Sequence, residues 1–142
     1  MMKIRIQKTN PEIKIPSYAH SGDAGMDLYS AEDVVIKQGE RKIIPTGIKM
    51  EIPASYVGLI WDKSGLASKN GLKIMAGVID STYRGEIKAV IINLSDREYR
   101  IEKNTKIAQM LIQKVESMEI EVVENLEDTL RGDGGFGSSG LE

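Results

Sequence analysis

The segments IKAVIINL (residues 87–94) and KIAQMLIQKV (residues 106–115) are two nearly unbroken apolar runs in the second half of the chain. Short apolar runs of this kind, without a polar residue at every second position, are typical of β-strands that are buried on both faces. We therefore expect both segments to form buried strands, and the rest of the fold to be built around them.

Other segments also have the pattern of strands. KIRIQ (residues 3–7) and MEIEVVE (residues 118–124) alternate apolar and polar side chains, which is the period of a half-buried strand. RKIIPTGIKMEI (residues 41–52) and YVGLIWDK (residues 56–63) are β-branched or aromatic runs bounded by Gly and Pro. We expect SDREYRIEKN (residues 95–104), which is highly charged, to form a solvated hairpin.

Helical periodicity is scarce. SGLASKNG (residues 64–71) predicts one or two helical turns, opened by a serine cap and closed by Asn-Gly. NLEDTL (residues 125–130) is a weaker helical candidate. About ten short strands with frequent turn residues indicate an all-β sandwich or jelly roll with one short helix.

The composition limits the class of protein. A chain of 142 residues has the size of one domain. Its 19 Lys and Arg against 21 Asp and Glu give a formal charge of −2. This balance argues against a protein that binds the negatively charged phosphate backbone of nucleic acids, which requires a positively charged surface. Cysteine is absent, and the sequence shows neither a signal peptide nor an apolar run long enough for a membrane span. We expect a cytoplasmic protein that binds neither membrane nor nucleic acid.

RGDGGFGSSG (residues 131–140) is half glycine, yet it contains the only phenylalanine of the chain, Phe136. Gly132, Gly134 and Gly137 fit the G-x-G-x-x-G pattern of a dinucleotide site, but too few residues follow for the helix that such a site needs. Two interpretations remain open. The segment is either a frayed tail or an arm that closes over a ligand, with Arg131 on a phosphate and Phe136 stacked on a base.

Several polar residues occupy unusual positions, and each has a structural and a functional interpretation. Asp80 follows an apolar pair and precedes a turn, so it is either a general base or an acid that bonds the turn. Asp27, in AGMDLYS, either holds a magnesium-bound water or stabilises a turn. Gln109 lies in an otherwise apolar strand and must satisfy a backbone group or face a ligand. His20, the only histidine, has no partner for a metal site and is expected at the surface.

DKSGLAS (residues 62–68) combines a lysine with a serine and a glycine at the start of the predicted helix. Backbone N–H groups and a hydroxyl at such a turn provide a seat for an anion. Ordinary helix capping explains the same residues, so both interpretations stay open at this point.

Five segments taken together, AGMDLYS, DKSGLASK, GVIDSTYRG, KIAQM and RGDGGFGSSG, closely resemble in their order the five motifs of the trimeric dUTP diphosphatase (dUTPase) family. The resemblance spans residues 24–140. It implies an all-β subunit with a jelly-roll-like distorted β-barrel over residues 1–130. It also implies a flexible glycine-rich arm over residues 131–142, which closes over the active site of a neighbouring subunit in a homotrimer.

The resemblance also implies an activity. A water activated by Asp80 attacks the α-phosphorus of dUTP in line, with Mg²⁺ as the cofactor, and the products are dUMP and pyrophosphate. Such an enzyme keeps uracil out of DNA and supplies dUMP for thymidylate synthesis. Two alternatives stay open: a bifunctional dCTP deaminase and dUTPase, and a non-catalytic trimer that binds nucleotide. Release of dUMP from dCTP would identify the first, and a lack of dUTP turnover the second.

The roles of single residues follow from the same resemblance. Asp80 is the catalytic base, and Asp27 holds the magnesium ion through a water. Tyr83 packs against the deoxyribose, Phe136 stacks on uracil, and Arg131 meets the γ-phosphate. The full set of residues expected to bind substrate is Lys63, Ser64, Gly65, Ile74, Met75, Gly77, Val78, Ile79, Tyr83, Lys106, Gln109, Arg131, Phe136, Gly137 and Ser138.

Three positions depart from the family pattern. Lys63 and Lys106 stand where the family usually has arginine, and lysine lacks the planar fork that grips two phosphate oxygens. We expect catalysis to survive with weaker positioning of the phosphates. Met75 stands where many relatives have a small residue, and it narrows the uracil pocket only if its side chain points inward.

Overall fold

The computed structural model describes residues 2–140. These residues form ten strands and one short helix: β1 (Arg5–Lys8), β2 (Gly25–Tyr29), β3 (Val34–Ile36), β4 (Arg41–Glu51), β5 (Tyr56–Trp61), α1 (Ser64–Asn70), β6 (Leu72–Met75), β7 (Val78–Ile79), β8 (Glu86–Asn93), β9 (Tyr99–Ile101) and β10 (Lys106–Lys114). The strands β8 and β10 confirm the expectation that both apolar runs form strands.

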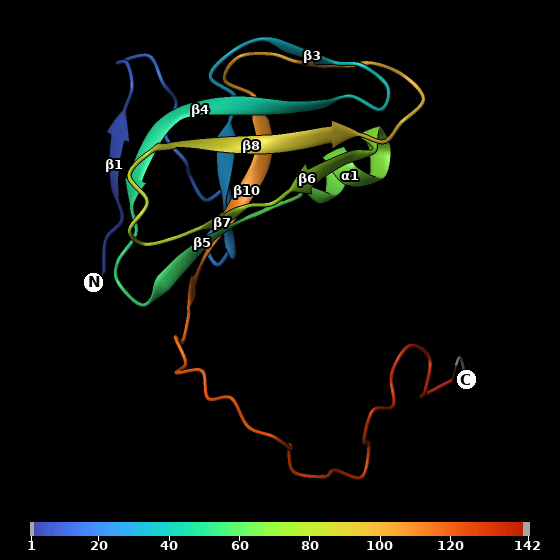
Figure 1. Cartoon of the computed structure of the whole chain (residues 1–142). Helices are drawn as coiled ribbons and strands as arrows, with labels where there is room; N and C mark the ends of the chain where they lie inside the picture. The colour runs from blue at the N-terminus through green and yellow to red at the C-terminus, as the bar shows by residue number, and fades with distance from the viewer. Residues whose placement is uncertain (1, 141–142) are drawn as a thin grey trace.

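Two four-stranded sheets make the body of the molecule (Figure 1). The first has the order β1-β4-β8-β6 and the second the order β2-β10-β5-β7, while β3 and β9 form a separate pair. All pairings are antiparallel. Neighbours in a sheet are mostly distant in sequence, as in a jelly roll. The expected all-β, jelly-roll-like fold with one short helix is confirmed.

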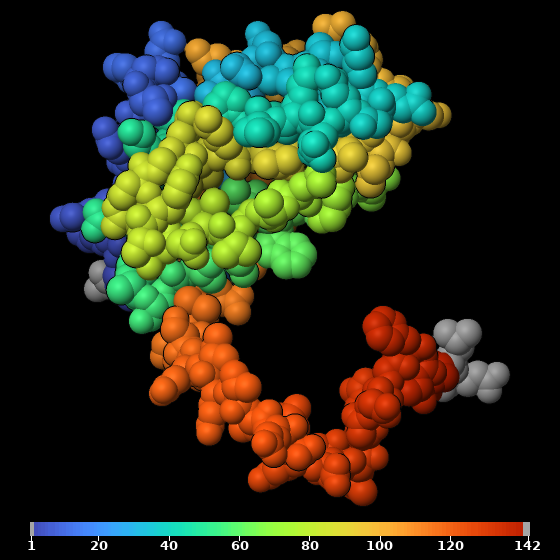
Figure 2. All heavy atoms as spheres, in the orientation of Figure 1, coloured from blue at the N-terminus to red at the C-terminus, as the bar shows by residue number. Residues whose placement is uncertain are grey.

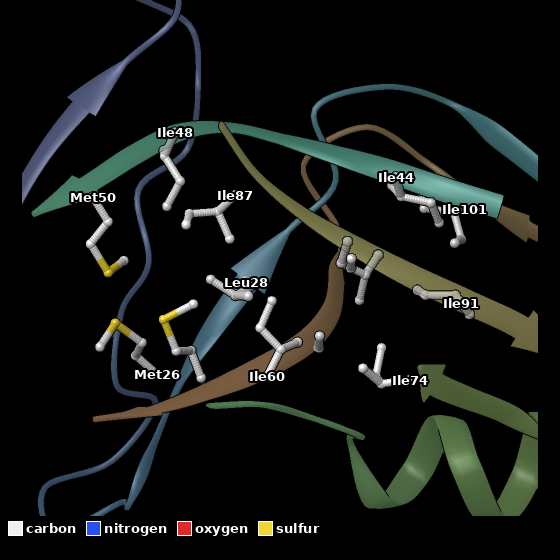
Figure 3. Packing of buried hydrophobic residues seen from close by; sticks show 14 of the residues in the cluster. Met26, Leu28, Ile44, Ile48, Met50, Ile60, Ile74, Ile87, Ile91 and Ile101 are labelled. Carbon is white, nitrogen blue, oxygen red and sulfur yellow. The ribbon is translucent and has the colours of Figure 1, made fainter. Parts of the chain in front are cut away.

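The core lies between the two sheets and consists mainly of isoleucine. Figure 3 shows Ile87 of β8 on the side of Leu28 of β2 and Ile91 of β8 near Ile74 of β6. In β8 the buried side chains alternate with less buried ones: Ile87, Ala89 and Ile91 are fully buried, whereas Val90 and Ile92 are half-buried. The expectation that β8 is buried on both faces is therefore wrong for the single subunit, because only one face meets the other sheet.

The two ends of helix α1 are capped in different ways. The N-cap position is Lys63, whose side chain makes no capping hydrogen bond, so the predicted serine cap is wrong. At the other end Gly71 has a φ of 65°, and its N–H bonds to the carbonyls of Ala67 and Leu66. This left-handed conformation favours glycine, which confirms the predicted Asn-Gly end.

Two further local predictions need correction. Residues 95–104 are not a solvated hairpin, because β9 pairs with β3 and Ile101 is buried. The segments 118–124 and 125–130 form neither the predicted strand nor the predicted helix. Extended backbone needs hydrogen bonds to a neighbouring strand, and in the described part of the chain residues 118–130 pair with no strand.

The residues after Val115 run away from the sheets as a long extended tail (Figures 1 and 2). Apolar side chains along it are exposed to solvent: 77% of Met118, 91% of Ile120 and 92% of Val122. The sheets therefore need no contribution from this tail. Within residues 2–140 no helix has the length and apolar character to cross a membrane.

Candidate active site

Asp27 is the centre of a cluster of charges on the second sheet. It lies in β2 directly opposite Gln109 of β10, and only 4% of its side chain is exposed. The ammonium group of Lys63 lies 2.5 Å from Oδ1, and that of Lys106 lies 2.7 Å from Oδ2. Strand pairing thus brings together three predicted site residues that are far apart in sequence.

The two lysines determine the ionisation of this acid. Burial raises the pKa of Asp27, but hydrogen bonds and charges from Lys106 and Lys63 outweigh it and hold the pKa below its usual range. Conversely, the hydrogen bond and charge of Asp27 raise the pKa of Lys106. At neutral pH the cluster therefore contains one buried negative charge and two positive charges, with an excess of positive charge toward solvent.

Three more predicted residues adjoin this cluster. Ser64 and Gly65 form the exposed first turn of α1 directly after Lys63, and the space around Gly65 is open. The amide of Gln109 donates a hydrogen bond of 2.8 Å to the carbonyl of Asp62. A Cβ at Gly25 would lie 2.4 Å from Gln109 Oε1, so glycine leaves the room that this amide occupies.

The turn between β6 and β7, which passes from the first sheet to the second, bounds a cavity of about 210 Å³. It contains Ala76 and Gly77 with φ angles of 58° and 109°. A Cβ at Gly77 would lie 2.8 Å from the carbonyl of Ile60, so the turn can pack this closely on β5 only with glycine there. The cavity is lined by Leu59, Ile60, Trp61, Lys73, Ile74, Ala76, Gly77 and Val78.

Only some of the residues that were predicted to bind the base line this cavity. Ile74, Gly77 and Val78 line it, whereas Ile79 lines a neighbouring hollow. Met75 is half-buried at the end of β6 and is absent from the lining of the cavity. In this subunit Met75 therefore does not narrow it.

Asp80 and Tyr83 share the neighbouring hollow, which has a volume of about 170 Å³. Tyr83 donates a hydrogen bond of 3.0 Å to the carbonyl of Glu86, and its ring packs so closely on Gly85 that a Cβ there would lie 2.3 Å from the hydroxyl. Asp80 is exposed, and its carboxylate has no hydrogen-bond or ion-pair partner among residues 2–140. Both oxygens of Asp80 are thus open to water and ligand.

The arm residues lie apart from these groups. Phe136 is fully exposed, and Arg131 donates only to the carbonyl of Gly134 within the arm itself. Gly137 and Ser138 are exposed as well. Figure 2 shows the arm separated from the body by open space. One subunit therefore forms the lysine cluster around Asp27 and, separately, the hollow with Asp80 and Tyr83, and the arm residues lie on neither.

Two residues beside the site had no role in the sequence analysis. Asp62 contacts β6 and Gln109, and Trp61, the only tryptophan, lines the base-side cavity with 53% of its surface exposed. In the sequence, the only indication of a role for Asp62 is its position between an apolar strand and the Ser-Gly turn. His20 is exposed as expected, 3.3 Å from the carboxylate of Asp23.

An all-β subunit that has a lysine pair beside a Ser-Gly turn and, at a separate hollow, an exposed carboxylate has the features of an enzyme for an anionic substrate. The particular family follows from comparison with known proteins. The family model for dUTPase matches residues 11–140. The chain belongs to the dUTPase family.

Two curated relatives are similar to this chain over nearly their full length. The chain is 48% identical to the deoxyuridine 5'-triphosphate nucleotidohydrolase of Clostridium kluyveri, over 98% of this chain and 99% of that protein. It is 50% identical to the protein of the same name from Nautilia profundicola, over 98% and 99% of the two chains.

Solved structures show the same fold. A mutant dUTPase of Staphylococcus bacteriophage 80alpha with dUpNHpp has a TM-score of 0.94 and 31% identity, and the match covers 99% of this chain and 100% of that one. A mutant dUTPase from phage phi11 of S. aureus, whose structure concerns the coordination of a structural Mg(II) ion, has a TM-score of 0.84 and 28% identity, over 89% and 100% of the two chains.

Proposed function

We propose that this protein hydrolyses dUTP to dUMP and pyrophosphate. The observation that carries the proposal is the family match over residues 11–140, which includes Asp80, the lysine cluster and the arm. The arrangement in the body supports it, because a positively charged cluster for phosphate lies on the same sheet as a base-sized cavity and an unpaired carboxylate.

Asp80 is the proposed general base. Its carboxylate accepts a proton from a water molecule, and the water oxygen forms a bond to the α-phosphorus of dUTP. The bond from that phosphorus to the oxygen bridging to the β-phosphate breaks on the opposite side, and pyrophosphate leaves. The exposure of Asp80 and its lack of partners in the described part of the chain support this role, because a base must be free to hold water.

Lys63 and Lys106 are the proposed phosphate-binding cations, together with Ser64, Gly65 and Gln109. Asp27 holds both ammonium groups near each other before substrate binds. A phosphate group that approaches them meets charges already in place, so less side-chain freedom is lost on binding. Lysine acts here as a point charge and does not grip two oxygens at once.

The site also fits a magnesium ion held mainly by substrate. Residues 2–140 contain no group of three or more His, Asp or Glu side chains placed to hold a metal, so the triphosphate and water would supply most ligands. Asp27 Oδ2 is buried and has the ammonium of Lys106, 2.7 Å away, as its neighbour, so its remaining lone pair can accept a hydrogen bond from a metal-bound water. When bound, Mg²⁺ offsets the charge of the phosphates and of the leaving pyrophosphate.

The β6–β7 turn and Tyr83 are proposed to select the nucleoside. The cavity beside Ile74, Gly77 and Val78 offers backbone groups at its rim for a pyrimidine edge. Tyr83, fixed by its bond to Glu86, stands beside Asp80 and leaves no room for a 2′-hydroxyl on the sugar. Steric exclusion is needed, because an apolar pocket by itself rejects an added hydroxyl only by about a hundredfold.

We further propose a homotrimer in which residues 131–142 of one subunit close over the site of another. The exposed tail supports this, since its apolar side chains find no partner in their own subunit. Trp61 and Val78 at the base-side cavity are apolar and are 53% and 67% exposed, so a neighbouring subunit would bury further apolar surface by covering them. In the closed state Phe136 would stack on uracil and Arg131 would meet the γ-phosphate, with Gly137 and Ser138 allowing a close approach.

The test is release of pyrophosphate, measured as phosphate after addition of a pyrophosphatase. We expect turnover of dUTP with Mg²⁺ and at least a hundredfold lower turnover of UTP, dTTP and dCTP, on the order of what steric and polar discrimination allows. No release from dUTP would contradict the proposal and favour a nucleotide-binding protein. Formation of dUMP from dCTP would favour the deaminase alternative. Light scattering in the same buffer measures the assembly.

A further inference from the structure

Lys88 of β8 lies at the hollow that contains Asp80 and Tyr83. The hollow has a volume of about 170 Å³ and is lined by Val78, Ile79, Asp80, Tyr83, Glu86 and Lys88. The two neighbours of Lys88 in the strand, Ile87 and Ala89, are fully buried in the core. Because side chains alternate along a strand, Lys88 points to the opposite, outer face of the sheet, where it is exposed.

The path of β6 leaves this part of β8 open. β6 pairs with residues 90–93 of β8 and ends at Met75. Ala76 and Gly77 then take positive φ angles, and the chain passes to β7 in the second sheet. Within residues 2–140, the stretch of β8 from Glu86 to Ala89 therefore has β4 on one side and no strand on the other. A ligand in the hollow can approach Lys88 from that open side.

The positive charge of Lys88 is not neutralised by the two acids of the hollow. In the described part of the chain its ammonium group forms no ion pair with Asp80 or Glu86. Glu86 directs its Oε1 to β4, where it accepts a hydrogen bond of 2.9 Å from the backbone N–H of Gly47. Among the residues that line the hollow, Lys88 is the only cation. The hollow therefore offers one cation without an ion-pair partner beside the proposed base.

The proposed function puts the sugar and the reacting phosphorus of dUTP at this hollow, because Tyr83 packs against the deoxyribose and Asp80 holds the attacking water. The phosphate bonded to the 5′-oxygen of the sugar is the α-phosphate. Its non-bridging oxygens carry negative charge while water attacks the phosphorus. A cation already in place beside these oxygens stabilises the transition state.

We propose that Lys88 is a further catalytic residue, whose ammonium group contacts a non-bridging oxygen of the α-phosphate. Lys88 keeps its proton and forms no covalent bond, so its contribution is electrostatic. The inference rests on the proposed function, because only that function puts an α-phosphate here. It needs only residues of one hollow in one subunit, whichever subunit supplies the remaining phosphate contacts.

Two variants separate the charge of Lys88 from its bulk. Lys88→Met keeps most of the aliphatic chain and removes the charge, whereas Lys88→Arg keeps the charge. We expect Lys88→Met to lower kcat/KM for dUTP by about tenfold to a hundredfold, as loss of a hydrogen bond between charged groups allows. Lys88→Arg should stay within about threefold of wild type.

Lys42→Met is the matched control. Lys42 lies on β4 of the same sheet, its ammonium group is 3.7 Å from Glu40, and it does not line the hollow. The substitution changes the net charge by the same amount, so an effect of overall charge would lower kcat/KM in both variants. We expect Lys42→Met to keep the wild-type value. If Lys88→Met does not fold, Lys88→Gln takes its place.

Binding of two ligands without turnover tests the contact directly. The monophosphate dUMP carries only the α-phosphate, and deoxyuridine carries none. Calorimetry should show a Kd for dUMP that is about tenfold higher in Lys88→Met than in wild type, and a Kd for deoxyuridine that is unchanged. Light scattering should show the same assembly mass for both proteins.

Three results would overturn the inference: wild-type kcat/KM in Lys88→Met, equal weakening of dUMP and deoxyuridine, or a loss of assembly mass in Lys88→Met alone. The second would assign Lys88 to the nucleoside, and the third to a contact between subunits. A wild-type protein that binds dUMP but releases no pyrophosphate from dUTP would contradict the proposed function. The comparison of dUMP with deoxyuridine would then still decide whether Lys88 contacts the phosphate.

Discussion

Asp27 and Asp80 are both acids of the candidate site, but the subunit surrounds them in opposite ways. Asp27 is buried and paired with Lys63 and Lys106, whereas Asp80 is exposed and unpaired in the described residues. A carboxylate held by two cations is a poor base, because the cations stabilise its ionised form. The comparison shows that the ion pairs of Asp27 form within one subunit, whereas the carboxylate of Asp80 stays open to solvent.

The largest effect is expected at the open acid. Asp80→Asn should lower kcat for dUTP by about a thousandfold, because the amide cannot take a proton from water, and should leave KM close to wild type. Pyrophosphate release under saturating dUTP measures it. Asp96→Asn, an exposed acid of another loop, is the control. A variant at position 80 with near wild-type turnover would remove Asp80 from the role of base.

Removal of residues 131–142 should have the next largest effect. We expect kcat/KM to fall on the order of a hundredfold, because the open site no longer closes over substrate. The melting temperature should not change, since the last strand ends at Lys114 and nearly all of residues 131–140 are exposed to solvent. Phe136→Ala in the full chain should cost about tenfold by loss of stacking. Unfolding of the truncated chain would instead make the arm a structural element.

The paired acid should give a smaller kinetic effect of a different kind. Asp27→Asn leaves the two lysines without their common partner, so we expect KM for dUTP to rise by about tenfold and kcat to fall less. Steady-state kinetics with saturating Mg²⁺ measure this ratio. A fall in kcat as large as that of Asp80→Asn, with no change in KM, would contradict the distinction between the two acids.

Stability should depend on pH through Asp27. Its pKa is lowered in the folded state, so its contribution is present above the ordinary carboxyl pKa of about 4 and is lost as the pH falls through the folded value. Melting temperatures measured from pH 6 to pH 3 should therefore fall less steeply in Asp27→Asn than in wild type. Parallel curves would show that the two lysines contribute nothing to the stability of the fold.

The smallest effect is expected from Lys63→Arg and Lys106→Arg. Arginine keeps the charge and adds a planar fork for two phosphate oxygens, so KM for dUTP should fall by about twofold to threefold. Kinetics of the single and double variants measure this. An increase in KM would show that the pairing geometry with Asp27, which suits an ammonium group, matters more than the fork.

Much of the fold follows from local patterns in the sequence. The apolar runs that became β8 and β10, the turn at Gly71 and the single helix were all visible as short-range features. The failed strand prediction has a clear physical cause. Residues 118–124 alternate apolar and polar side chains as a strand does, but a strand also needs a free sheet edge to pair with. The alternation within the segment does not indicate whether the same subunit offers such an edge.

The sequence alone determined that the protein is all-β and that its functional residues occur in five ordered motifs. Only the tertiary structure decided that Lys63 and Lys106 share one buried carboxylate, that Asp62 ties β6 to the end of β5, and that Asp80 has no partner. The reason is physical: strand propensity depends on neighbouring residues, whereas these contacts depend on the register of strands that are distant in sequence.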